Sequence, residues 1–105
     1  MFNQYLEIME EAKFFTHKLK PSESFVILND ILDGYKATEQ ERKYAKKLNL
    51  TQFFELFDDD DNLYYTGYMH EDIEDEFQPL DWAMYDSGCT YMKVRNPVTK
   101  KMEIL

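Results

Sequence analysis

The sequence contains only one cysteine, Cys89, among its 105 residues. A single cysteine cannot form an internal disulfide, which makes the reducing cytoplasm the expected compartment. The N-terminus lacks the basic segment and apolar run of a secretory signal. The longest strongly apolar run, at residues 25–28, is far shorter than the ~20 residues that span a bilayer. We therefore expect a soluble, cytoplasmic protein that does not enter the membrane.

The sequence also lacks the motifs of common catalytic and metal sites. It has two histidines and three glycines, and these form no nucleophile elbow, phosphate-binding glycine loop or paired Cys/His ligand pattern. The aspartates at 58–61 do not fit a calcium loop. A loop that begins at Asp58 places Leu63 where glycine is needed and Met69 where glutamate is needed. We therefore expect no enzyme, no catalytic residue, no cofactor and no dedicated metal site.

Basic residues are scarce in one half of the chain. Lysine and arginine number 12 against 21 aspartates and glutamates, for a net charge of -9. Residues 1–50 carry eight basic and eight acidic side chains, whereas residues 51–105 carry four and thirteen. Nucleic acids and anionic membranes select for basic surfaces, so neither is an expected direct partner. The asymmetry favours a cationic partner protein that is attracted by long-range electrostatics.

Residues 55–86 contain no lysine or arginine and combine carboxylates with aromatic rings. The acidic members are Glu55, Asp58, Asp59, Asp60, Asp61, Glu71, Asp72, Glu74, Asp75, Glu76, Asp81 and Asp86, and the rings are Phe57, Tyr64, Tyr65, Tyr68, Phe77, Trp82 and Tyr85. A purely solvating acidic tail would be poor in aromatic residues, because such a segment cannot bury enough apolar surface to fold. The mixture indicates a folded segment with a strong negative field.

Hydrophobic periodicity predicts about four helices in the N-terminal part of the chain. Apolar residues recur at helical spacing over 2–19, before Pro21, and again over 25–35, before or around Gly34. Thr38 and Glu41 stand three residues apart, as in a capping box, and predict a third helix over 38–48. Thr51 is a candidate cap for a fourth, short helix over 51–57.

The C-terminal part is predicted to be a small antiparallel sheet. We expect strands at 63–69 and 80–85, and a hairpin of 89–95 with 100–105 around the turn 96–99. Residues 70–78 are expected to form a loop or short helix that is closed by Pro79. Alternation in the hairpin places Met92, Val94, Met102 and Ile104 on one buried face. The predicted fold is α+β in a single domain over 1–105, with a mainly helical half at 1–57 and an acidic, mainly β half at 58–105.

Residues 41–51 resemble the first helix and turn of a helix-turn-helix unit of the phage-repressor type. The resemblance places Ala45 under a second helix and Leu48 and Leu50 beside the turn, with Asn49 where glycine is common. It implies a recognition helix over 51–58, but that segment is apolar and acidic where DNA readers carry basic or amide side chains. The unit is thus expected to be a structural or protein-binding scaffold.

These observations predict a small acidic inhibitor that binds a basic, nucleic-acid-binding protein or complex, as DNA mimics of phages and other mobile elements do. That likeness is one of composition and size. Carboxylates two apart on a strand or three to four apart on a helix lie roughly 6–7 Å from each other, near the spacing of phosphates along DNA. The expected partner-binding residues are Asp58, Asp59, Asp60, Asp61, Tyr64, Tyr68, Glu71, Asp72, Glu74, Asp75, Glu76, Asp81, Trp82 and Tyr85.

Other interpretations remain open. The same surface suits an immunity protein or antitoxin that masks a basic nuclease toxin. A regulatory adaptor derived from a helix-turn-helix is a third possibility, as a monomer or homodimer. Simpler alternatives are that the acids only solvate a loop, that the rings are ordinary core, and that Lys93, Arg95, Lys100 and Lys101 neutralise part of the acidic surface.

Overall fold

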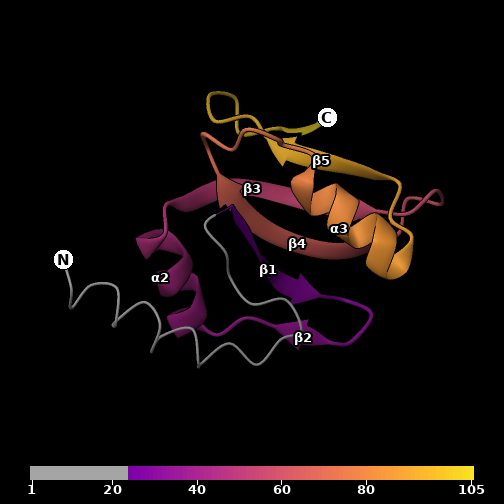
Figure 1. The fold of residues 1–105 in the computed structure, drawn as a ribbon, viewed down its shortest axis with the longest axis horizontal. Helices are drawn as coiled ribbons and strands as arrows, with labels where there is room; N and C mark the ends of the chain where they lie inside the picture. The colour runs from indigo at the N-terminus through magenta and orange to yellow at the C-terminus, as the bar shows by residue number, and fades with distance from the viewer. Residues whose placement is uncertain (1–23) are drawn as a thin grey trace.

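The computed structural model describes residues 24–105, which form one antiparallel sheet of six strands with a helix against each face (Figure 1). The elements are β1 (Phe25–Asp30), β2 (Tyr35–Lys36), α2 (Glu39–Lys47), β3 (Leu50–Phe57), β4 (Leu63–His70), α3 (Gln78–Ser87), β5 (Tyr91–Arg95) and β6 (Met102–Ile104). The strand order across the sheet is β2-β1-β4-β3-β5-β6. The hairpin of β3 and β4 therefore forms its centre.

The alternation of side chains along β1 divides the apolar residues between two cores. Phe25 and Ile27 point to the side of the sheet that α3 covers, where Leu80 and Ala83 pack against them. Val26 and Leu28 point to the other side, where they pack with Tyr44 and Ala45 of α2. We call these two sides the α3 face and the α2 face. The contiguous apolar run at 25–28 is thus explained by burial on both faces.

Gly67 lies at the centre of the sheet, where β4 passes between β1 and β3. A Cβ atom at this position would lie 2.1 Å from the carbonyl oxygen of Val26 and 2.8 Å from Cζ of Phe54. Only glycine fits such a close approach of backbone and ring. The same glycine therefore supports the packing of Phe54 in the core of the α3 face.

The prediction of a helix over 25–35 is wrong, because this segment forms β1 and β2. Ile31 and Leu32, which a helix would have buried, are 50% and 57% exposed in the connecting turn. Gly34 adopts a left-handed conformation with φ 70° in that turn rather than ending a helix. A short apolar run has no decisive period, and here burial on both faces of a sheet determined its conformation.

The predicted helix over 51–57 is also wrong, and the helix-turn-helix prediction fails with it. Asn49, with φ 61°, reverses the chain after α2, and the following residues form β3. Phe54 and Leu56 alternate into the core of the α3 face, which is a strand period. No second helix follows the turn, so the resemblance to repressors ends at residue 49.

The predicted strand over 80–85 is instead part of helix α3. Pro79 stands in the first turn of that helix, where its missing N–H costs nothing, instead of closing the preceding loop. Leu80 and Ala83 are buried at the i, i+3 spacing of a helix. Gly88 ends α3 in a left-handed conformation with φ 78°.

Three predicted elements are confirmed: the capped helix α2, the strand at 63–69 and the C-terminal hairpin. The prediction of which side chains form the buried face of the hairpin was partly wrong. Lys93 pairs with Ile104 and Arg95 with Met102, so these apolar side chains share a face with the cations. Ile104 is accordingly 70% exposed. Residues 24–105 contain two helices, against three predicted there, and the helix predicted over 2–19 lies outside the described residues.

Candidate functional site

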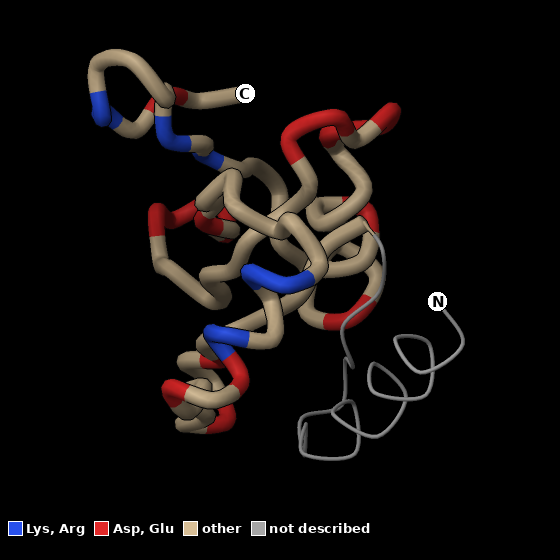
Figure 2. Tube along the Cα trace, turned by 90° about the vertical axis from the view of Figure 1, so that its left-hand side faces the viewer, with Lys and Arg blue, Asp and Glu red and all other residues tan. Residues whose placement is uncertain are grey.

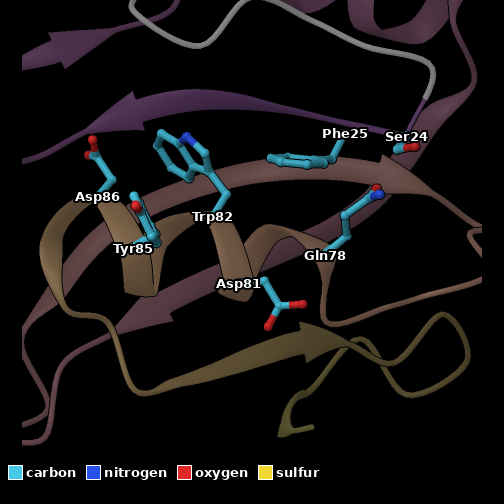
Figure 3. A pocket seen from close by; sticks show the side chains of 7 residues that line it. All are labelled: Ser24, Phe25, Gln78, Asp81, Trp82, Tyr85 and Asp86. Carbon is cyan, nitrogen blue, oxygen red and sulfur yellow. The ribbon is translucent and has the colours of Figure 1, made fainter.

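A cavity of about 740 Å³ lies beside α3, and we call it the α3 groove. It is lined by Ser24, Phe25, Gln78, Asp81, Trp82, Tyr85 and Asp86. The five α3 residues have the spacing i, i+3, i+4, i+7 and i+8, which places them along one side of the helix. Figure 3 shows Trp82 and Tyr85 side by side, with Asp86 at one end of the groove and Ser24 and Gln78 at the other.

The two large rings of the α3 groove have different environments. Trp82 packs edge-on against Tyr65 at a centroid distance of 4.9 Å and also contacts Phe25 at 6.5 Å. The hydroxyl of Tyr65 donates to Asp86 Oδ2 at 2.7 Å, which fixes the carboxylate near these rings. Tyr85 is 97% exposed. Trp82 therefore belongs partly to the core, whereas Tyr85 is available for a partner.

The acidic loop at residues 71–77 adjoins the α3 groove. A second cavity, of about 340 Å³, is lined by residues of this loop and shares Ser24 and Gln78 with the groove. Ile73 packs against the core of the α3 face and attaches the loop to the sheet. The backbone N–H of Asp72 donates to Nδ1 of His70 at 3.0 Å, and that of Phe77 donates to Oδ1 of Asp75 at 3.0 Å. These bonds hold the backbone of the loop at Asp72 and fix the carboxylate of Asp75.

The aspartates at 58–61 form the turn between β3 and β4, and two of them stabilise it. Asp58 accepts hydrogen bonds from the backbone N–H groups of Asn62 and Asp60, each at 2.9 Å. These hydrogen bonds lower the pKa of Asp58 below its ordinary value, and the bond from Asn62 contributes most to the shift. Asp61 has φ 63° and accepts a hydrogen bond from the hydroxyl of Tyr91. The remaining two, Asp59 and Asp60, are exposed.

The two acidic clusters lie at opposite ends of β4, and α3 runs between them (Figure 1). Eight residues of strand separate the clusters, which corresponds to roughly 25 Å. Asp81 and Asp86 stand on the helix between them. Cys89 follows the C-terminal end of α3, where burial raises its pKa to about 11. The carboxylates of Asp58 and Asp86 contribute to that shift. We call the carboxylates of 58–61, 71–76, Asp81 and Asp86 the acidic row.

Lys93 of the hairpin lines a cavity together with Asp61, but no ion pair joins the two side chains. Within residues 24–105, no lysine or arginine forms an ion pair with the acids at 58–61 or 71–76, or with Asp81. The Lys93 ammonium lies 4.9 Å from the centre of the Phe57 ring, and the Arg95 guanidinium lies 4.5 Å from that of Phe53. Figure 2 shows the blue lysine and arginine positions of the hairpin beside the C-terminus. The red run at the upper right, which is the acidic loop at 71–76, lies apart from them.

The structure brings together part of the predicted binding residues. Asp72, Glu74 and Asp75 of the loop adjoin Asp81, Trp82 and Tyr85, because the two cavities that these residues line share Ser24 and Gln78. Glu71 instead accepts a hydrogen bond from Thr51 of β3. Tyr64 lies at the other end of the row, where a hydrogen bond with Asp58 raises its pKa. Tyr68 lies on the α2 face, with its ring 5.6 Å from that of Phe53.

Sequence reasoning did not select Gln78 or Asp86, which line the α3 groove. A helical reading of residues 78–86 would have placed both beside Asp81 and Tyr85. The strand predicted over 80–85 leaves Gln78 in the preceding loop and Asp86 beyond its end, so it does not place them on one surface.

Further observations concern metal ions and membranes. In the described part of the chain, no three potential metal-ligating side chains converge on one position. Neither of its helices has the length and apolar character needed to cross a membrane. No protein-family model matches this sequence, and no curated protein or solved structure shows significant similarity to it.

Proposed function

We propose that this protein is an acidic inhibitor that binds a basic, nucleic-acid-binding protein through the acidic row and the exposed ring of Tyr85. The observation that carries this proposal is that the carboxylates at 58–61, at 71–76 and of Asp81 form no ion pair with a basic residue among residues 24–105. Asp81 lines the α3 groove beside Tyr85, which is 97% exposed. The α3 groove gives that surface a concave centre. A partner with a basic groove would find charge and shape complementarity here.

Electrostatics and packing have separate roles in the proposed complex. The carboxylates at 58–61 and 71–76 attract a cationic groove over long distances and increase the association rate, an effect that salt screens. Tyr85 is positioned to insert into the partner, because an exposed tyrosine buries a large area and loses little conformational freedom. The row extends for roughly 25 Å, which is about the length of seven base-pair steps measured along the DNA axis. This length suits a DNA-binding groove that would otherwise hold nucleic acid.

The proposal predicts competition with nucleic acid. The immobilised protein should retain a basic protein from its host at low salt and release it at high salt. The purified partner should then bind a labelled DNA or RNA duplex, and added wild-type protein should displace that duplex in a fluorescence anisotropy titration. A nuclease toxin as the captured partner would select the immunity-protein alternative, which uses the same surface.

The matched variants carry equal changes of net charge. Asp72→Lys with Asp81→Lys reverses two carboxylates beside the α3 groove, and Glu39→Lys with Glu103→Lys reverses two exposed carboxylates elsewhere. The first pair should weaken displacement by about tenfold or more, and the second pair should change it little. Equal losses from both pairs, a partner that tolerates simultaneous nucleic acid, or duplex binding by the protein itself would contradict the proposal.

A further inference from the structure

A basic cavity lies on the α2 face of the sheet, away from the α3 groove. It measures about 390 Å³, and its lining residues are Arg42, Lys46, Leu50, Thr51, Tyr68 and Arg95. They come from α2 and from the strands β3, β4 and β5. We call this cavity the basic pocket. It collects three cations in a protein whose net charge is -9.

Rigid elements hold these cations in place. Arg42 and Lys46 are one helical turn apart on α2, which positions both on the side that faces the pocket. Tyr44 and Ala45 of the same helix are buried in the core of the α2 face. Arg95 approaches from the end of β5, where its carbonyl accepts a hydrogen bond from Gln52 Nε2 at 2.6 Å. The buried side chain of Leu50 contributes an apolar surface.

The charges of the pocket are not balanced by acidic side chains. Among residues 24–105, Arg42, Lys46 and Arg95 form no ion pair, and no carboxylate lines the cavity. Glu71 reaches the neighbourhood of the rim, where it accepts a hydrogen bond from Thr51 Oγ1 at 3.0 Å. Three cations in one concave site repel each other, and an anion that binds between them would relieve that repulsion.

We infer that the basic pocket binds the phosphoryl group of a small phosphorylated molecule. Two guanidinium groups and one ammonium can surround a tetrahedral dianion, since arginine offers paired N–H donors that match phosphate oxygens. Tyr68 also lines the pocket, and the centre of its ring lies 5.6 Å from that of Phe53. The volume is that of a small-ligand site. A long polyanion is disfavoured, because the acidic row would repel its remaining phosphates.

Three probes test this inference by calorimetric titration: adenosine monophosphate, inorganic phosphate and adenosine. Adenosine monophosphate should bind, inorganic phosphate should compete with it, and adenosine should not bind. Arg42→Gln and Arg95→Gln should each weaken binding of adenosine monophosphate by about tenfold, since each removes one charge-assisted contact. Lys43→Gln is the matched control. It removes the same charge from the same helix, but Lys43 lies 3.9 Å from Glu39 outside the pocket.

The possible outcomes are distinct. Loss of binding in the two pocket variants but not in Lys43→Gln, with unchanged circular dichroism, supports the inference. No binding of either phosphate probe, equal weakening by Lys43→Gln, or equal binding of adenosine would overturn it. Self-association of the wild type that Arg42→Gln abolishes would also overturn it, because the occupant would then be an acidic surface of a second copy. None of these variants changes the acidic row, so the result is independent of the proposed function.

Discussion

The two faces of the sheet use aromatic rings and charges in different ways. On the α2 face, the cations of Lys93 and Arg95 lie over the rings of Phe57 and Phe53. The hydrogen bonds of the buried Glu41 are made within the protein. Its carboxylate accepts a hydrogen bond from the Tyr35 hydroxyl at 2.5 Å, and it completes the capping box with Thr38. On the α3 face, the exposed Tyr85 lies in a groove that the carboxylates of Asp81 and Asp86 also line.

The difference shows that net charge describes this protein poorly. A value of -9 for the whole chain conceals a basic pocket, because alternation along the strands sends neighbouring side chains to opposite sides. The pairing of Lys93 with Ile104 and Arg95 with Met102 places the hairpin cations on the α2 face, away from the α3 groove, although Lys93 shares a cavity with Asp61 at one end of the acidic row. Charge separation across the sheet therefore permits two surfaces with opposite preferences in one small protein.

Gly67→Ala should disrupt both faces together and produce the largest effect. The added methyl would lie 2.1 Å from the Val26 carbonyl oxygen, so β1 and β4 would have to separate. We expect a loss of about 3 kcal/mol in the free energy of unfolding, measured by urea denaturation. Gly34→Ala is the control, since no atom lies within 4 Å of its Cβ position. Its cost should be about 1 kcal/mol, from the left-handed backbone alone. Equal costs would show that the close approach at Gly67 is unimportant.

Glu41→Ala should weaken the α2 face and spare the α3 face. It removes half of the capping box and the hydrogen bond from the Tyr35 hydroxyl to Glu41, for a cost of about 2 kcal/mol in unfolding free energy. Because α2 carries Arg42 and Lys46, binding of adenosine monophosphate should weaken as well, while partner binding through the acidic row stays unchanged. Glu39→Ala, which removes only an exposed ion pair, should cost a few tenths of a kcal/mol. Parallel losses at both faces would contradict their independence.

The success of the sequence predictions followed the range of the interactions involved. The capping box of Thr38 and Glu41 is complete within four residues, and the helix it begins was predicted with nearly the observed bounds. The runs that became β1, β3 and α3 carry apolar residues whose period is ambiguous over such short lengths. Their conformations depend on partners far along the chain, such as Leu56 opposite Met92.

The candidate site was predictable in composition but not in arrangement. The absence of basic residues from 55–86 indicated a negative surface, and within residues 24–105 the carboxylates at 71–76 indeed have no basic partner. Sequence could not show that Tyr68 would lie on the α2 face, because its placement depends on the register of β4. It also could not show the basic pocket, whose Arg42 and Arg95 are brought together only by the order of the strands.

The smallest expected effect concerns Asp58, at the end of the acidic row where structure and charge overlap. Hydrogen bonds from Asn62 and Asp60 lower the pKa of this carboxylate below its ordinary value of 3.8. A lowered folded-state pKa means that the ionised group stabilises the fold above the unfolded-state pKa, and that this stability is lost as the pH falls through the folded-state pKa. Wild type should therefore melt at a higher temperature than Asp58→Asn at neutral pH, and the difference should shrink as the pH falls below 3.8.

Asp59→Asn is the matched control for this pH dependence, because Asp59 is exposed in the same turn and should give no such difference. If Asp59→Asn reproduced the pH-dependent gap, the effect would come from general repulsion within the acidic row and not from the hydrogen bonds of Asp58. Measuring partner affinity together with the melting temperature distinguishes acids that stabilise the turn from acids that bind the partner. An acid that serves the turn can be replaced by an isosteric amide with a loss of stability, whereas an acid that serves recognition loses affinity while the melting temperature stays the same. Asp58 should belong to the first group and Asp72 to the second, so at least one acid of the row serves the fold while its neighbours serve recognition.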